Sequence, residues 1–227
     1  MDTEFSQNSF QWGMHRIGRW NASEIWQLMK PGRGKDAMFG QTALTYIEEV
    51  AAQRGLDDLY KSDVEFFKEY DNLVSVSSKF TEWGHEQEDV AAMNFALTYG
   101  YDLQECGSVD HPTIQNLSAS PDRIAVKDGV KEILEIKCPL PKAFGKYRME
   151  VHDTADLLGV KPEYYYQVQA QMCCTGIKMA NLVFFCPFMR SKIHRIRVAA
   201  DENVWREFAV RIDKAEELIS TLWKETA

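Results

Sequence analysis

The chain has 227 residues, of which 45% are hydrophobic and 26% charged, and its net charge is −8. This composition excludes a mainly disordered, collagen-like or coiled-coil protein and predicts one globular domain over residues 1–227. The charge also excludes a protein that coats nucleic acid with its whole surface, because such proteins are basic overall. Residues 1–115 hold 9 Lys and Arg against 19 Asp and Glu, whereas residues 116–227 hold 17 against 15. A site for a polyanion is therefore expected to be local and enclosed.

The apolar runs, the N-terminal segment and the cysteines indicate where in the cell the protein is located. No apolar run approaches the roughly 18 residues of a membrane span, and the N-terminus lacks the basic-then-apolar order of a signal peptide. The five cysteines form no C-x-x-C pair, so neither a disulfide framework nor a cysteine zinc site is predicted. We expect a cytoplasmic protein with no membrane partner.

Helical patterns dominate before residue 100. They predict helices over 21–29, 42–54 and 81–99, separated by a basic loop (30–35) and an acidic surface stretch (57–71). Asn21 and Glu24 have the spacing of a capping box, and Leu44 is expected to face inward from the second helix. Gly55 and Gly100 end the second and third helices.

Strand patterns begin after residue 100. They predict strands around 103–109 and 117–120, a hairpin of 123–127 with 131–138, a basic connection over 142–148, a helix over 162–175, strands over 181–185 and 193–198, and a long helix after Asp201. Asp128-Gly129 is a strong signal for the hairpin turn. The expected fold is α/β, with a central mixed sheet of about five strands flanked by helices.

The hairpin brings together the residues with the most distinctive chemistry. Asp122 stands just before its first arm, and Glu135 and Lys137 alternate on one face of the second, so the three are expected to meet at one sheet edge. Carboxylates and an ammonium among Ile, Leu and Val are costly to bury without compensation. A salt-bridged hairpin would provide it, and so would a metal.

A metal site has the donors that it needs. Asp122, Glu135 and the Ile136 carbonyl supply oxygen ligands of the kind that Mg²⁺ takes, with positions left for a phosphate and water. Lys137 would then hold, or help to deprotonate, a water that attacks phosphorus. The spacing alone leaves this reading and the salt bridge equally weighted.

Two helical side chains could join this site. Glu88 falls in register with Ala91, Ala92 and Phe95, so its carboxylate lies on the apolar face of the 81–99 helix, where a salt bridge is the alternative to a metal ligand. On the 162–175 helix, Gln167 could position water or phosphate, or could make a structural hydrogen bond.

An anion site is predicted near the N-terminus. Ser23 would lie in the first turn of the 21–29 helix, where free amides favour an anion, and the fork-shaped Arg16 suits a terminal phosphate. A helix-start serine and a surface arginine are the plain alternatives.

Five motifs in order resemble those of the lambda exonuclease family of phage recombination nucleases, within the restriction-endonuclease-like PD-(D/E)xK superfamily. They are Trp12-x-x-x-Arg16-x-Gly18 with Ala22-Ser23-Glu24, Trp83-Gly84 with Glu88, Ser120-Pro121-Asp122, Leu134-Glu135-Ile136-Lys137-Cys138-Pro139, and Tyr166-Gln167-Val168-Gln169.

The resemblance implies a Mg²⁺-dependent exonuclease, with Mn²⁺ as the alternative ion, that degrades one strand of linear double-stranded DNA from its 5′ end. It further implies release of mononucleotides, a 3′ single-stranded tail for phage recombination, a homotrimeric ring, a single-strand annealing partner and a host bacterial cytosol. It places the metal at Asp122, Glu135, Ile136 and Glu88, adds Lys137 and Gln167 (rather than Gln169) as catalytic residues, and assigns the 5′-phosphate to Arg16 and Ser23. It also matches Arg33 to a loop that reaches into the duplex.

Two other functions compete with this one. A related endonuclease would share the acidic cluster but would have no use for an end-binding pocket at Arg16 and Ser23. A non-catalytic DNA-end-binding module would have no reason to keep Asp122, Glu135 and Lys137 together. The acidic stretch over 57–79 is longer than the family pattern leads us to expect.

Overall fold

A five-stranded mixed sheet forms the centre of the fold, with the strand order β2-β5-β6-β7-β8. The structure is a computed structural model that describes residues 9–34, 37–74 and 79–224, with side chains up to residue 221 and none at 79–81. The strands are β1 (Trp20–Asn21), β2 (Asp102–Glu105), β3 (Val109–Asp110), β4 (Leu117–Ala119), β5 (Arg123–Lys127), β6 (Val130–Lys137), β7 (Met179–Phe185) and β8 (Ile193–Ala199). The helices are α1 (Phe10–Arg16), the 3₁₀ turn η1 (Ile25–Gln27), α2 (Gln41–Arg54), α3 (Asp58–Ser62), α4 (Val64–Val74), α5 (Lys79–Tyr99), α6 (Pro141–Glu150), α7 (Thr154–Val160), α8 (Pro162–Thr175) and α9 (Glu202–Lys224).

The β5–β6 hairpin turns where the sequence predicts. Asp128 and Gly129 both have positive φ, 51° and 78°, as a two-residue hairpin turn that follows the strand twist requires. The register pairs Arg123 with Leu134, and β6 then runs parallel to β7. Glu135 and Lys137 therefore lie at the end of the central strand β6, and Asp122 directly precedes the neighbouring strand β5.

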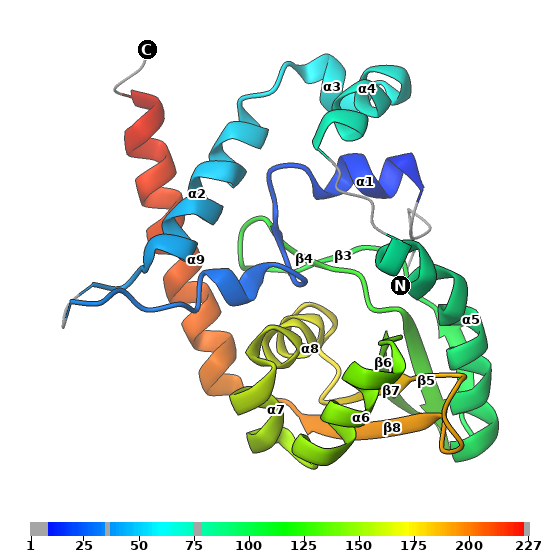
Figure 1. The fold of residues 1–227 in the computed structure, drawn as a ribbon. Coiled ribbons are helices and arrows are strands. Elements are labelled where there is room, and N and C mark those ends of the chain that lie inside the picture. Colours follow the sequence, from blue (N-terminus) through cyan, green and yellow to red (C-terminus); the bar gives the residue numbers. More distant parts are fainter. Residues whose placement is uncertain (1–8, 35–36, 75–78, 225–227) are drawn as a thin grey trace.

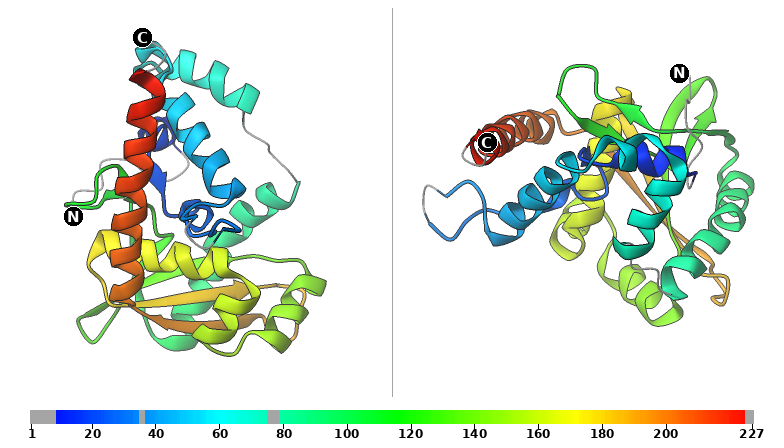
Figure 2. Two further views of the ribbon diagram at one scale, coloured as in Figure 1. Left: turned by 90° about the vertical axis from the view of Figure 1, so that its left-hand side faces the viewer. Right: turned by 90° about the horizontal axis from the view of Figure 1, so that it is seen from above.

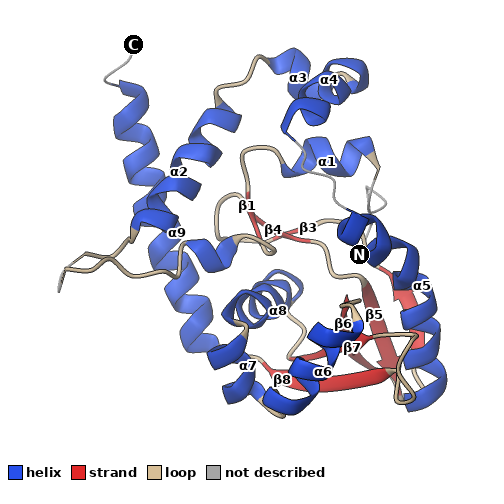
Figure 3. Cartoon of the chain, viewed as in Figure 1, coloured by secondary structure: helices blue, strands red, loops and turns tan. Residues whose placement is uncertain are grey.

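Helices cover the two faces of the sheet (Figures 1 and 3). On one face, Ala91 and Phe95 of α5 pack against Leu134, Ile136 and Val183. The other face, which carries Ile133 and Leu182, packs against α6, α7 and α8 through their apolar side chains, among them Phe144, Leu157, Val168 and Met172. The alternation along β6 therefore directs Glu135 and Lys137 toward α8.

A second, three-stranded sheet lies on the other side of α8, with the order β1-β4-β3. Its core includes Trp20 and Leu117, and it is closed by α2 and α9, which run side by side at one end of the molecule, while α5 stands at the other end (Figure 2). Leu44 of α2 is 37% exposed, so its expected inward direction is wrong, whereas Ile47, Val50 and Ala51 are buried. The inward face is rotated toward Ala43 and Tyr46.

The expected helix over 21–29 is mostly absent. Residues Trp20–Asn21 form a short strand parallel to β4, and the helical part is the single turn η1. Asn21 makes no cap, since its side-chain amide donates to the carbonyls of Arg16 and Arg19 at 3.0 and 3.2 Å. Pairing with β4 decides this segment against its local helical pattern.

The acidic stretch forms α3 and α4, and α4 packs against α1. Phe67 is 5% exposed and packs edge-on against Phe10, with ring centroids 6.1 Å apart. A Cβ at Gly13 would stand 2.7 Å from the Phe67 ring, so this close approach of α1 to α4 requires glycine. Residues 75–78 of the stretch lie outside the described residues.

One further helix differs from the sequence pattern, and another agrees with it. The basic connection over 142–148 is the helix α6, which starts at Pro141, a residue suited to the first helical turn. The helix over 162–175 agrees with α8, and Gly176 ends it with φ of 74°.

Within the described part of the chain, no helix combines the length and apolar character that crossing a membrane requires.

Candidate active site

One cavity of about 610 Å³ gathers nearly all the candidate residues. Its lining comprises Trp12, Arg16, Ser23, Gly84, His85, Glu88, Ser120, Asp122, Glu135, Ile136, Lys137, Cys138, Tyr164 and Gln167. Arg33 is not part of this lining and is exposed. Its loop projects beside α2 and α9, on the side away from α5 (Figures 1 and 2).

The hairpin holds the first two carboxylates. Asp122 directly precedes β5, and its Oδ2 accepts the backbone N–H of Ile136 on the paired strand at 2.6 Å. Glu135 lies one residue earlier on β6 and is 2% exposed. The register of the hairpin thus places both carboxylates at the same end of the sheet, on the α8 side.

Three donors hold the Glu135 carboxylate. Its Oε1 accepts from Lys137 Nζ at 2.7 Å and from Gln167 Nε2 at 2.6 Å. Its Oε2 accepts from Gln171 Nε2 at 2.6 Å. The salt bridge considered for Lys137 therefore exists, and it lies inside the cavity.

Electrostatics set the charge state of this cluster. Withdrawal from water, followed by the negative charges of Glu135 and Glu88, raises the pKa of Asp122 well above its ordinary value. Burial would lower the pKa of Lys137, but the carboxylates of Glu135 and Asp122 outweigh it and raise that pKa. Lys137 is therefore a protonated ammonium here, which suits holding and charge stabilisation better than taking a proton from water.

Glu88 faces the cluster from α5. Its side chain is 19% exposed and accepts from Arg123 Nη1 at 3.3 Å. Burial raises the pKa of Glu88, and the charge of Arg123 partly offsets this shift. Glu86, two residues earlier on α5, is exposed. The salt bridge considered for Glu88 therefore exists, and the carboxylate also lines the cavity, whereas its role as a metal ligand stays a prediction.

The N-terminal residues approach the cavity from α1. Arg16 Nη2 donates to Ser23 Oγ at 2.9 Å, and the Arg16 guanidinium lies 4.5 Å from the centre of the Trp12 ring. Trp12 Nε1 in turn donates to Ser120 Oγ at 2.8 Å, which joins α1 to the Ser120-Pro121-Asp122 segment. Ser23 precedes the short turn η1 and is not in the first turn of a longer helix, so the expected helix is wrong, whereas the anion site at Arg16 and Ser23 stays a prediction. What remains is a guanidinium and a hydroxyl in contact at the cavity wall.

The donor set fits a hard divalent cation. Asp122, Glu135 and the Ile136 carbonyl offer oxygen ligands. Burial raises the pKa of Asp122 and repulsion from the other carboxylates adds to it, and a cation would relieve this repulsion. Within residues 9–34, 37–74 and 79–224, no three His, Cys, Asp and Glu side chains form a group that could hold a metal by themselves. A cation at this position would therefore need the backbone carbonyl and oxygens from water or substrate to complete its shell.

Three residues here were not assigned a role from the sequence. Gln171 is fully buried and reaches Glu135 one helical turn after Gln167. Trp12 contacts the Arg16 guanidinium and donates a hydrogen bond to Ser120. The centre of the Tyr164 ring lies 5.1 Å from Lys137 Nζ. The i, i+3 and i+4 spacing on α8 was the signal available for Gln171.

Gln169 faces away from the cavity. Its amide donates to the Ala199 carbonyl at 2.8 Å, and its oxygen accepts from the Asp201 N–H at 2.9 Å. Gln167 is thus the one of the two glutamines that lies in the cavity.

The five-stranded mixed sheet and its flanking helices define the class of fold, an α/β core of the restriction-endonuclease-like type. Residues 11–178 match the model of the YqaJ-like viral recombinase domain. The chain therefore belongs to the YqaJ-like viral recombinase family, which agrees with the lambda exonuclease resemblance.

Solved structures share the fold. LHK-Exo, an alkaline exonuclease from Laribacter hongkongensis, superposes in its complex with dAMP with a TM-score of 0.74 and 23% identity, over 96% of this chain and 98% of that chain. A phage-related exonuclease from Haemophilus somnus 129PT superposes with a TM-score of 0.69 and 16% identity, over 92% of this chain and 96% of that chain.

The uncharacterized protein R354 of Acanthamoeba polyphaga mimivirus is 29% identical over 146 residues, and the match spans 60% of this chain but 23% of that protein.

Proposed function

We propose that the protein is a Mg²⁺-dependent exonuclease that degrades one strand of linear double-stranded DNA from a 5′-phosphorylated end. Mononucleotides leave, and a 3′ single-stranded tail remains for phage-type recombination by strand annealing. LHK-Exo, which shares the fold, binds dAMP, and this supports a mononucleotide product.

The main support is that one cavity holds two sets of groups. Asp122, Glu135 and Lys137 offer a centre for phosphodiester hydrolysis, while Arg16 and Ser23 offer a second, cationic position for a phosphate. A cleavage centre beside an end-binding position suits an enzyme that removes nucleotides from a terminus.

Each residue has a task in this reaction. A divalent cation at Asp122, Glu135 and the Ile136 carbonyl would neutralise charge on the scissile phosphate, and Glu88 lines the same cavity. The Lys137 ammonium, which lies beside Glu135, would stabilise negative charge on the reacting phosphate. Gln167 donates to Glu135 and keeps its carbonyl oxygen as an acceptor that can orient the attacking water. Arg16 and Ser23 hold the terminal phosphate through charge-assisted hydrogen bonds.

The remaining parts of the proposal concern assembly and setting. A homotrimeric ring would reconcile the net charge of −8 with a locally positive passage for DNA. Arg33, on its exposed loop, would contact DNA outside the cavity of its own chain. The expected partner is a single-strand annealing protein, and the expected location is the cytoplasm of a bacterial host of a phage or prophage.

The test is time-resolved digestion of a linear duplex labelled separately at each terminus, with Mg²⁺ and with EDTA. We expect label at the 5′ terminus to be released first as a mononucleotide, and no release in EDTA. A covalently closed circular duplex of the same sequence should survive. Cleavage of the circle would show an endonuclease, and binding of ends without any release would show a non-catalytic end-binding module.

A further inference from the structure

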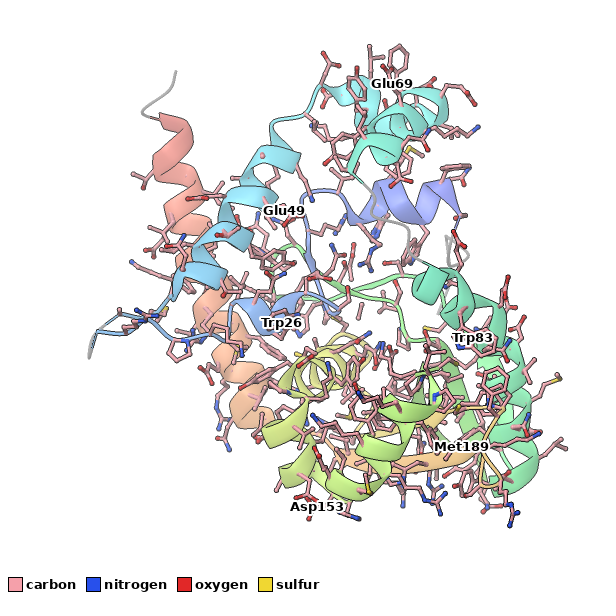
Figure 4. All side chains as sticks on the ribbon, viewed as in Figure 1. Trp26, Glu49, Glu69, Trp83, Asp153 and Met189 are labelled. Carbon is pink, nitrogen blue, oxygen red and sulfur yellow. The ribbon has the colours of Figure 1, made fainter. Side chains whose placement is uncertain are left out.

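A pair of stacked aromatic rings stands beside the cavity. Trp83 of α5 and Phe188 of the β7–β8 loop have ring centroids 5.4 Å apart and planes inclined by 12°. Gly84 and His85, which directly follow Trp83, line the cavity. Figure 4 places Trp83 and the loop residue Met189 on the same side of the molecule. The aromatic pair therefore lies at the rim of the candidate active site.

Phe188 is exposed although its loop is ordered by hydrogen bonds. It keeps 65% of its surface exposed, whereas the Cys186 N–H donates to the Lys192 carbonyl at 2.9 Å and closes the loop. The Met189 N–H donates to the Cys186 carbonyl at 3.2 Å. Phe188 thus rests one face on Trp83 and presents apolar surface to solvent from a tied loop.

The loop that carries this ring is rich in positive charge. Arg190 and Lys192 are exposed in the same loop, and Arg148 of α6 donates to the Ser191 carbonyl at 3.5 Å. The sequence from 186 to 197 contains four Lys and Arg and no Asp or Glu, in a chain whose net charge is −8. Glu82 and Glu86 lie close to Trp83 in the sequence of α5 and are acidic. The positive charge therefore comes from the loop and from α6.

We propose that the 186–192 loop, with Trp83 and Arg148, binds a single strand of DNA at the edge of the active site. One nucleobase stacks on Phe188, and the flanking phosphates contact Arg190, Lys192 and Arg148. Exposed aromatic rings interleaved with cations bind single strands, because an unpaired base has a free face for stacking. In a duplex that face is covered by the neighbouring base pair. This inference rests on the proposed nuclease function, since it concerns the part of the same substrate that is unpaired.

The test is binding of a fluorescent oligothymidylate, followed by anisotropy in EDTA so that no cleavage occurs. We expect Phe188→Ala to weaken binding about five- to fifty-fold, in line with the loss of one stacked base, and Phe188→Trp to bind like the wild type. Arg190→Ala with Lys192→Ala should weaken binding and reduce its dependence on salt. A blunt-ended duplex should lose less than about two-fold with Phe188→Ala, because a duplex offers no free base face for stacking.

Phe66→Ala is the matched control. Phe66 is 40% exposed and packs against Tyr60 on the acidic part of the chain, so its loss should leave single-strand binding unchanged. Equal affinity of Phe188→Ala and wild type would overturn the inference, as would an equal loss on single strand and duplex. Binding is measured without turnover. A wild-type protein without exonuclease activity would therefore reject the proposed function, and the binding data would still test the single-strand site.

Discussion

Gln171 Nε2 donates to Glu135 Oε2 at 2.6 Å from a position with no solvent exposure, while the Gln171 carbonyl oxygen is buried with no hydrogen-bond partner among the described residues. The amide thus fixes the orientation of a carboxylate that Lys137 and Gln167 hold from the other oxygen. Gln171 therefore provides a hydrogen bond to Glu135 while its own carbonyl oxygen stays without one.

Gln171→Met should therefore reduce nuclease activity strongly and change the free energy of unfolding little. The variant loses a hydrogen bond to Glu135 but also removes an unpaired buried oxygen, so the two effects on stability oppose each other. Residues that orient metal ligands affect metal affinity or activity by about 10- to 100-fold, and we expect a loss in that range at low Mg²⁺ that is partly recovered at high Mg²⁺. Calorimetric titration of the ion and thermal melting separate the two effects. An exposed glutamine on β2, Gln104, provides the control.

Lys137→Ala should remove cleavage and leave DNA binding in place. The variant loses the cation that lies 2.7 Å from Glu135 and that the Asp122 carboxylate also attracts. Loss of a positioned catalytic group typically costs about 10²- to 10⁴-fold in rate. Single-turnover digestion measures the rate, and anisotropy measures binding. Lys131→Ala, at the exposed end of the same strand, should digest DNA at the normal rate. Normal digestion by Lys137→Ala would reject the role of this amine.

Arg16→Ala should distinguish one kind of DNA end from another. If Arg16 and Ser23 hold the terminal phosphate, the variant loses a charge-assisted contact that 5′-hydroxyl ends never make. We expect processive digestion of 5′-phosphorylated duplex to fall about 10-fold or more, with a smaller loss on 5′-hydroxyl duplex. Arg19→Ala is matched to it, because Arg19 pairs with Asp110 at 3.0 Å and does not line the active-site cavity. An equal loss on both ends would remove the phosphate assignment.

Glu216 should make stability depend on pH in the acid range. Burial would raise its pKa, but hydrogen bonds from Arg54, Asn116 and Trp20 and the charge of Arg54 outweigh burial and lower the pKa below 4.5. The native state then binds its proton less tightly than the unfolded chain. The stabilisation is complete above about pH 4.5 and is lost as the pH falls through the native pKa.

Glu216→Gln should accordingly unfold at lower urea, with a loss of about 1–3 kcal/mol near neutral pH and a smaller difference in acid. The distances support the magnitude, since Glu216 Oε1 accepts from Trp20 Nε1 and Arg54 Nη2, both at 2.8 Å. Glu217→Gln is the neighbouring control, because Glu217 is exposed and pairs with Lys214 at the surface. A pH-independent difference for Glu216→Gln would contradict the linkage.

The sequence by itself determined the hairpin and the cluster that depends on it. Asp128-Gly129 fixes the turn locally, and the two-residue alternation of a strand then places Glu135 and Lys137 on one face near Asp122. The start of α8 at Pro162 and its end at Gly176 are likewise local signals, and helical spacing alone puts Gln167 and Gln171 on one strip.

Only the tertiary structure decided which side chains those faces meet. The 21–29 segment became a strand and a 3₁₀ turn because pairing with β4 satisfies its backbone, and Asn21 then bonds Arg16 and Arg19 instead of capping a helix. The contacts of Trp12 with Ser120 and of Gln171 with Glu135 join segments 108 and 36 residues apart. Local propensity carries no information about such partners, because they are fixed by how the helices pack across the sheet.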